Sequence, residues 1–341
     1  MPKKLRLGIV GLDHWYAGLA VAEDAARNEN VELVAIAHRD EPRGRETVER
    51  FGAGEYTADY MALATRGDLD VVATACYCSE NAPLAAAAAK AGSHVLSVKP
   101  IAMTAAEAET IREAVRAAGV RFMSFESNYR ITPTFRQIKE WVDGGRIGKV
   151  ISAYTVLRSG LPTQQWPGVP GRTWWLDPTK TPGGGWIDHS IYHVDFLRWL
   201  LNDEVARVGG DVANLKHEDI APLEDYGLAQ LTFRGGARAT VEVTWTGASG
   251  AGLNRIDVVG TEGQIVWDPT VSGKTALSGK TDPSGWLLTS TPARAASALA
   301  HLAETLAGRG QTAGTVDDAC ANLAVCEAFY RAAREGRATN L

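Results

Sequence analysis

Short apolar runs alternate with alanine-rich, helix-like stretches throughout residues 1–124, and no other feature limits the possible folds so strongly. The predicted strands are Leu5–Val10, Val31–His38, Gly54–Thr57, Val71–Ala75, His94–Ser97 and Arg121–Ser124. Helices are predicted between them, at about 15–28, 42–51, 58–66, 81–91 and 104–118. Strict alternation of strand and helix is typical of crossover units, so the sequence predicts an α/β domain with a doubly wound parallel sheet.

Beyond residue 125 the pattern changes to longer strands in which polar and apolar residues alternate. The predicted elements are a helix at 133–143, a strand at 149–158, an irregular Pro/Gly/Trp-rich segment at 160–185, a helix at 186–202, strands at 206–215, 225–233, 238–246, 253–260 and 263–267, and helices at 291–308 and 316–335. These runs predict an α+β domain with a large, open, mostly antiparallel sheet. Because 341 residues exceed one ordinary core, we expect two domains, 1–124 and 125–341.

Charge and composition exclude several classes of protein. The net charge is −5 and no basic stripe is present, so a nucleic acid is not an expected partner. No apolar run is long enough to span a bilayer, and the start lacks the apolar core of a signal peptide, so we expect a cytoplasmic protein without a membrane partner. The four cysteines (Cys76, Cys78, Cys320 and Cys326) fit no metal or disulfide framework.

The segment Gly183–Leu200 carries the strongest chemical signal. Three glycines permit a tight turn and close approach to a ligand, and an amphipathic helix pattern follows them. Asp188 and Tyr192 are four residues apart, so they project from one face of that helix. A carboxylate beside a phenol can orient it for proton transfer. The alternative is a capped surface helix in which Asp188 complements the helix dipole.

A second segment, Ser97-Val98-Lys99-Pro100, follows the apolar run His94–Leu96. Together the two segments resemble the Gfo/Idh/MocA family of nicotinamide-dependent sugar oxidoreductases, which carry a Lys-Pro dipeptide after the fifth strand and a Gly-Gly-Gly, Asp-x-x-x-His helix in the second domain. The stretches that also resemble the family are residues 5–11, 70–74, 88–95 and 144–150. The resemblance implies an N-terminal Rossmann domain for the cofactor and a C-terminal domain for substrate binding and oligomerisation.

The turn after the first strand departs from the usual GxGxxG phosphate loop. Gly11 holds the first glycine position, but Asp13 stands at the second and Tyr16 at the third. A carboxylate near two phosphates is unfavourable unless Asp13 turns away to cap the helix. The residues that the resemblance places beside the cofactor in this turn are Gly11, Leu12, Asp13, His14 and Trp15.

His38 stands where a family member that uses NAD normally has an acidic residue. Without that acid a 2′-phosphate is not repelled, and Arg39 can clamp it, so we expect NADP rather than NAD. The alternative is that Arg39 is simply solvated. By resemblance, the further cofactor contacts are Ala75, Cys76, Asn81, Lys99, Pro100 and Asn128, with the two cysteines of this loop, Cys76 and Cys78, acting as packing residues rather than nucleophiles.

The resemblance assigns the chemistry to Lys99, Asp188 and Tyr192. Lys99 supplies the positive charge that stabilises a developing alkoxide, and Tyr192 stands where the family usually has a histidine base. A phenol needs neighbouring cations to act as a base near neutral pH, and Lys99 with an oxidised nicotinamide would supply them. His189 and His193 have metal-ligand spacing, but no third ligand stands out and we expect no metal.

The aromatic segment before the glycines is expected to bind the sugar. Aromatic faces stack on the C–H faces of sugars and arginine donates to their oxygens, and the candidates are Trp166, Arg172, Trp174 and Trp175, with His189 and Tyr192. The alternative for Trp174 and Trp175 is that they plug the junction between the domains.

The sequence therefore predicts an NAD(P)-dependent oxidoreductase that transfers hydride between the nicotinamide and a carbinol of a sugar, cyclitol or sugar derivative. Two alternatives are a glycosidase or lyase of the same family that uses a bound dinucleotide transiently, and a non-catalytic dinucleotide-sensing protein. Alternation of Ala239, Val241, Val243 and Trp245 with polar residues leaves one sheet face without helices, so we expect a homodimer or homotetramer.

Overall fold

The computed structural model describes residues 4–248, 251–279, 285–290 and 297–341. By packing, the chain divides into two compact units. Unit 1 comprises Met1–Asn128, Thr163–Pro182 and Ala296–Leu323, and unit 2 comprises Tyr129–Pro162, Gly183–Ala295 and Ala324–Leu341. Two segments that the sequence analysis placed in the second domain, 163–182 and 296–323, thus pack with the N-terminal part of the chain.

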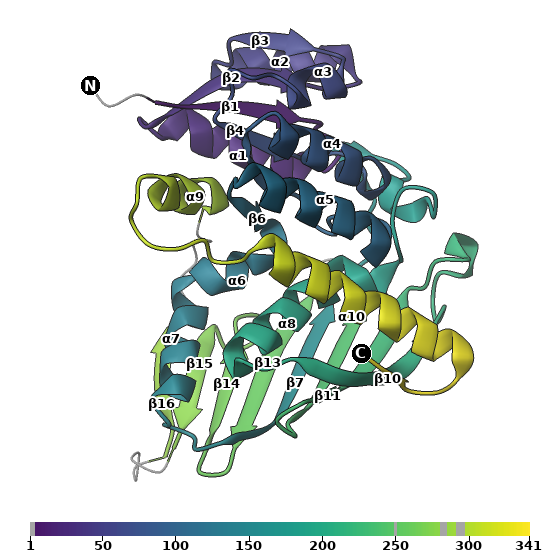
Figure 1. Ribbon diagram of the computed structural model, residues 1–341. Coiled ribbons are helices and arrows are strands. Elements are labelled where there is room, and N and C mark those ends of the chain that lie inside the picture. Colours follow the sequence, from purple (N-terminus) through teal and green to yellow (C-terminus); the bar gives the residue numbers. More distant parts are fainter. Residues whose placement is uncertain (1–3, 249–250, 280–284, 291–296) are drawn as a thin grey trace. The chain divides into compact units, whose positions relative to one another are not determined.

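Unit 1 contains the predicted parallel sheet (Figure 1), with strand order β3-β2-β1-β4-β5-β6. The strands are β1 (Leu5–Val10), β2 (Val31–Ala37), β3 (Glu55–Thr57), β4 (Val71–Thr74), β5 (His94–Ser97) and β6 (Phe122–Ser124). The central strands are almost wholly apolar and buried, as required of parallel strands covered on both faces. The strand order reverses beside β1, which is the doubly wound arrangement that binds dinucleotides, and the predicted α/β fold is confirmed.

The helices of the crossovers are α1 (Trp15–Arg27), α2 (Glu41–Phe51), α3 (Tyr60–Ala64), α4 (Cys78–Lys90) and α5 (Ala105–Ala118). Side chains at the start of some of these helices fix where the helix begins. The Asp40 carboxylate accepts a hydrogen bond from Arg43 N at the start of α2, and the Thr104 hydroxyl accepts one from Glu107 N at the start of α5. α9 (Ala298–Leu306) packs on α1. Ser297, the residue before α9, attaches the start of α9 to α1, because its hydroxyl donates to Asp24 at 2.6 Å.

Residues 163–182, hereafter the arm, form a small structure of their own within unit 1. The arm contains a hairpin of β8 (Gln164–Trp166) and β9 (Val169–Pro170), followed by a 3₁₀ turn at Trp174–Leu176. The sequence analysis predicted only an irregular loop here. The hairpin was missed because its strands are very short and Gly168, with φ of +75°, makes the turn between them.

Unit 2 is built on a nine-stranded sheet of order β16-β15-β14-β13-β7-β12-β11-β10-β17. Its strands are β7 (Val150–Arg158), β10 (Val205–Ala213), β11 (Tyr226–Phe233), β12 (Arg238–Thr244), β13 (Leu253–Gly260), β14 (Gln264–Asp268), β15 (Lys274–Ser278), β16 (Leu287–Ser290) and β17 (Thr339–Asn340). Neighbours are antiparallel except β7 and β12, which are parallel, so the predicted large, mostly antiparallel sheet is confirmed. The sequence analysis did not predict the strands β15, β16 and β17.

The helices outside the crossovers are α6 (Asn128–Ile131), α7 (Pro133–Asp143), α8 (Gly185–Leu201) and α10 (Val316–Glu335). α8 lies against β12, where Ala239, Val241 and Val243 are buried while Thr240 and Glu242 are half-buried. The alternation predicted for this strand is therefore confirmed. No helix among the described residues is both long enough and apolar enough to cross a membrane.

Candidate cofactor and catalytic sites

The turn after β1 is shaped by Gly11, which has φ of +84°. A Cβ at this position would lie 3.0 Å from the backbone of Cys76, so only glycine fits. The turn is fixed on both sides: His14 N donates to the Ala75 carbonyl at 2.9 Å, and Leu12 N donates to His38 Nδ1 at 3.4 Å. The backbone thus forms the close-approach turn of a dinucleotide site even though the later glycines are absent.

Asp13 is buried in an ion-pair network and does not cap α1, contrary to the expectation from sequence. Arg39 donates to both of its carboxylate oxygens, at 2.8 and 3.2 Å, and the Tyr60 hydroxyl donates to Oδ2 at 2.9 Å. Burial raises the pKa of Asp13 above its usual value, while the Arg39 charge opposes that rise. The positive charge of Arg39 therefore offsets the negative charge of Asp13, which stands at the second glycine position.

Arg39 is therefore ion-paired rather than simply solvated, and its contact with a 2′-phosphate stays a prediction. Its guanidinium also donates to Glu80 at 2.5 Å and lies over the rings of Tyr60 and Tyr77, 5.0 and 4.3 Å from their centres. Two carboxylates and two aromatic faces therefore hold this side chain beside Asp13.

His38 and Arg43 form the end of the site beside β2. Burial lowers the pKa of His38 to about 4, so the ring is neutral at physiological pH. It lies nearly parallel to the indole of Trp166, with ring centres 6.0 Å apart and planes at 15°. Arg43, in the first turn of α2, places its guanidinium 5.2 Å from the centre of the same indole.

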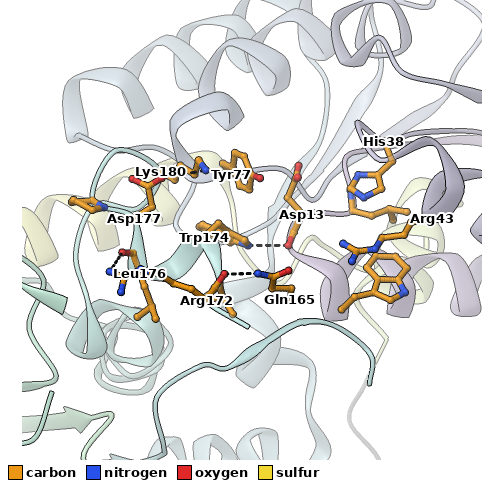
Figure 2. Close-up of a pocket in the computed structure, with 14 residues that line it drawn as sticks. Asp13, His38, Arg43, Tyr77, Gln165, Arg172, Trp174, Leu176, Asp177 and Lys180 are labelled. Carbon is orange, nitrogen blue, oxygen red and sulfur yellow. Dashed lines mark hydrogen bonds and ion pairs between the residues drawn. The ribbon is translucent and has the colours of Figure 1, made fainter. Parts of the chain in front are cut away.

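A cavity of about 570 Å³ lies between the Gly11 turn and the arm (Figure 2). Its lining residues are Leu12, Asp13, His38, Arg43, Tyr77, Gln165, Trp166, Arg172, Thr173, Trp174, Leu176, Asp177, Pro178 and Lys180. Aromatic faces, three cations and a glycine turn suit a nicotinamide dinucleotide, with rings for stacking and positive charges for phosphates. Trp166, Arg172 and Trp174, which the sequence assigned to the sugar, line this cavity beside the Gly11 turn, and their contact with a sugar stays a prediction.

Lys99 is buried in unit 1 just after β5, with 1% of its surface exposed. Its Nζ lies 4.7 Å from the centre of the Trp175 indole, in a cation–π contact. Trp175 stacks on Trp174 with ring centres 4.3 Å apart, and Trp174 Nε1 donates to the Asp13 carbonyl at 2.8 Å. The arm thereby connects the Gly11 turn to Lys99.

Asn81, Cys76 and Cys78 lie between the end of β4 and the first turn of α4, and all three are buried. Asn81 Nδ2 donates to the Ser97 hydroxyl at 2.9 Å and to the Ile101 carbonyl at 2.7 Å, bracketing the Lys99-Pro100 turn. Burial raises the pKa of Cys76 well above its usual value, which fits a packing residue. Direct contacts of Asn81, Pro100 and Asn128 with a cofactor stay predictions.

In unit 2, Glu224 fixes the glycine turn that begins α8. Its buried carboxylate accepts hydrogen bonds from Gly184 N and Trp186 N, at 3.1 and 3.0 Å, and from the Tyr330 hydroxyl at 2.8 Å. A Cβ at Gly184 would lie 2.2 Å from the Glu224 carbonyl oxygen, so the close approach requires glycine. The negative charge also complements the N-terminal end of the helix dipole.

Asp188 is held by a partner that the sequence analysis did not identify. Trp245 Nε1 donates to Asp188 Oδ2 at 3.0 Å, and His189 Nδ1 lies 3.0 Å from the same oxygen. Tyr192, one turn further along α8, is half-buried, and its ring centre is 5.8 Å from that of Tyr129 and 6.1 Å from that of His189. Asp188, His189 and Tyr192 therefore share one region of α8.

His193 points into the interior of unit 2, and neither ring nitrogen has a hydrogen-bond partner among the residues that the structure describes. Burial lowers its pKa to about 3. Within the described parts of the chain, no three His, Cys, Asp or Glu side chains are grouped so that they could hold a metal ion.

Several residues of these sites were missed from sequence. Arg43 follows His38 by five residues and falls in the first turn of the next helix, so its spacing was a usable signal. Tyr60, Glu224, Trp245 and Lys180 reach their sites only through long-range packing, which no local pattern reveals.

Comparison with known proteins agrees with this geometry. Residues 5–126 match the oxidoreductase family with an NAD-binding Rossmann fold, and residues 135–266 match the GFO/IDH/MocA C-terminal domain. The chain is 30% identical over 267 residues to myo-inositol 2-dehydrogenase of Thermotoga maritima, which covers 77% of this chain and 75% of that protein. It is 26% identical over 255 residues to levoglucosan dehydrogenase of Pseudarthrobacter phenanthrenivorans, covering 68% and 64%.

Among solved structures, the aldose-aldose oxidoreductase from Caulobacter crescentus is 25% identical, with a TM-score of 0.83 over 99% of this chain and 100% of that chain. The protein belongs to the Gfo/Idh/MocA family. It is an oxidoreductase with an NAD-binding Rossmann domain, as the sequence predicted.

The buried His193 predicts a pH-dependent cost to stability. Because its pKa is about 3 in the folded protein and about 6.5 when unfolded, the unfolded chain binds more protons between these values, and the wild type loses stability as the pH falls below about 6.5. His193→Leu removes this loss. Urea unfolding at about pH 7.5 and about pH 5 should show the variant gaining ~2 kcal/mol relative to wild type at the lower pH. If the free energy of unfolding changed with pH in the same way in wild type and variant, the low pKa of His193 would be contradicted.

Proposed function

We propose that this protein transfers hydride between NADP(H) and a carbinol of a sugar, cyclitol or sugar derivative. The observation that carries the proposal is Lys99, a buried lysine at the carboxyl edge of the Rossmann sheet, where such folds bind the reactive part of a dinucleotide. The names of the relatives, inositol and levoglucosan dehydrogenases, support the substrate class. A panel of sugars and cyclitols, each with both cofactors, tests it through a net change in the absorbance of the reduced nicotinamide.

When bound, the nicotinamide supplies the hydride acceptor or donor. In the proposed reaction Lys99 stabilises negative charge on the substrate oxygen, and the Tyr192 hydroxyl exchanges the proton of the carbinol. Asp188, held by Trp245, orients the phenol or a substrate hydroxyl, and His189 hydrogen-bonds further hydroxyls of the sugar. Trp175 keeps Lys99 in place through its ring face.

The proposed cofactor is NADP, and the proposed cation for its 2′-phosphate is Arg43. The neutral His38 replaces the acidic residue that would repel this phosphate. Arg43 lines the cavity beside His38, whereas Arg39 is paired with Asp13 and Glu80. Arg43 also pairs with a carboxylate, since its Nε lies 3.4 Å from Asp40 Oδ2, and the other N–H groups of its guanidinium are the proposed donors to the phosphate.

We also propose that the protein is cytoplasmic, which its four buried free thiols support.

Substitution of Tyr192 tests the proton-transfer assignment. Tyr192→Phe keeps the ring and its packing but removes the hydroxyl, so kcat should fall by about 10²–10⁴ while cofactor affinity changes little. Tyr129→Phe is the matched control, because its ring contacts Tyr192 but it has no proposed part in the reaction. Steady-state kinetics of both variants distinguish them. A greater loss in Tyr129→Phe, or in His193→Asn, would overturn the assignment.

Substitution of Arg43 tests the cofactor preference. Arg43→Ala should weaken NADPH binding by about 1–2 kcal/mol, because a charge-assisted contact is lost, and should leave NADH binding nearly unchanged. Arg45→Ala provides a control of equal charge on the same helix, where Arg45 pairs with Glu41 away from the cavity. Fluorescence titration measures the affinities of the wild type and of both variants for NADPH and NADH. Equal losses for NADPH and NADH in Arg43→Ala contradict the proposal.

The sheet of unit 2 supports the proposal of a homodimer or homotetramer. Tyr154, Val266 and Leu288 lie on one sheet face by strand register, opposite the face that α8 covers, and Leu288 is 59% exposed. A broad sheet face that carries exposed apolar side chains is commonly buried against a second subunit. Light scattering at micromolar concentration should give two or four times the mass of the chain, and a monomeric mass counts against the proposal.

A further inference from the structure

Three hydrogen bonds fasten the arm to the elements around the Gly11 turn. Trp15 Nε1, at the start of α1, donates to the Gln164 carbonyl at 3.2 Å. Trp174 Nε1 donates to the Asp13 carbonyl at 2.8 Å (Figure 2), and Ser79 N, at the start of α4, donates to the Lys180 carbonyl at 3.4 Å. The arm is thus attached to both sides of the turn and at its centre.

Trp166, near the tip of the arm, lines the end of the cavity beside His38 and β2. In our proposal this end holds the adenosine of the dinucleotide. The Trp166 indole is nearly parallel to the His38 ring, with centres 6.0 Å apart, and its centre lies 5.2 Å from the Arg43 guanidinium. Two aromatic rings need about 7 Å between them to admit a third, so a small outward movement of the hairpin gives room for stacking. His38 and Trp166 both line the cavity, which places this contact on the ligand side of the arm.

Hydrogen bonds within the arm hold its hairpin and the following turn together, so these can move as one piece. Gly171 N donates to the Thr163 carbonyl at 2.7 Å, closing the base of the hairpin. Gln165 Nε2 donates to the Arg172 carbonyl at 2.9 Å, and Arg172 Nη2 donates to the Leu176 carbonyl at 3.2 Å. A preformed hairpin loses little conformational entropy when it closes on a ligand.

We propose that the arm is a clasp for the dinucleotide: a cofactor bound against Gly11 and Asp13 lies beneath residues 163–182 and leaves only when the hairpin lifts. This inference rests on the proposed function only in taking the ligand to be a nicotinamide dinucleotide. It assigns Trp15, Gln164 and Trp166 to cofactor retention, and it transfers Trp166 and Trp174 from the sugar to the cofactor.

The clasp has a kinetic signature. An arm that only gates the site would slow association and dissociation by the same factor, leaving affinity unchanged. Because Trp166 also faces the ligand, its closure should slow dissociation more than association. The dissociation rate of the cofactor, measured without any sugar, therefore reports on the clasp directly.

Two substitutions separate the parts of the clasp. Trp166→Ala removes the closing ring, and Trp15→Phe keeps the ring at the start of α1 but removes the donor to Gln164. Bound NADPH is displaced by excess NADP⁺ in a stopped-flow fluorimeter. We expect NADPH to dissociate at least ~10-fold faster from Trp166→Ala and ~3-fold faster from Trp15→Phe. Trp286→Ala, an exposed tryptophan of unit 2, is the control and should match wild type.

The outcomes are distinct. Wild-type dissociation rates in both Trp166→Ala and Trp15→Phe would overturn the clasp while leaving the proposed function intact. Failure of the wild type to bind either NADPH or NADH would overturn the cofactor assignment and the clasp with it. Should Trp166→Ala misfold by circular dichroism, the conservative Trp15→Phe decides the question alone.

Discussion

The ion pair between Arg39 and Asp13 is the interaction on which the cofactor site depends. A carboxylate at the second position of a phosphate loop would repel the pyrophosphate of any dinucleotide. Arg39 binds both oxygens of Asp13 and is itself fixed by Glu80 and by the faces of Tyr60 and Tyr77. The eroded glycine motif is thus compatible with anion binding, because the same structure that admits the acid also supplies its counter-charge.

The arm provides what the glycine loop lacks. In the usual motif, glycines let the backbone approach the phosphates closely, whereas here only Gly11 has that conformation. The cavity instead receives cations and indole faces from residues 163–182, which are remote in sequence but pack in the same unit. The aromatic residues of this segment thus pack around the Gly11 turn, and Trp175, stacked on Trp174, contacts Lys99.

In unit 2 the helix α8, which carries Asp188 and Tyr192, is positioned by its first turn. Glu224 binds the backbone of the glycine turn, and its neighbour Asp225 accepts a hydrogen bond from Trp245 N through its carbonyl, at 2.7 Å. Trp245 in turn holds Asp188. Two adjacent acidic residues just before β11 thus fix both the beginning of α8 and the position of Trp245, the partner of Asp188.

The sequence by itself determined the fold class, the family and the longer helices and strands, because strand and helix periodicity and the Lys-Pro and Gly-Gly-Gly signals are local. The short elements β8, β9, β15, β16, β17 and α6 were not predicted. The sequence also located Gly11 and Lys99 just beyond their strands, Asp188 in the first turn of α8, and Tyr192 one turn further along that helix. Only the tertiary structure decided which side chains meet: Asp13 turns to Arg39 rather than to its helix, and Trp166 packs on His38. Ion pairs and ring contacts between residues tens of positions apart depend on chain packing, which leaves no periodic trace in the sequence.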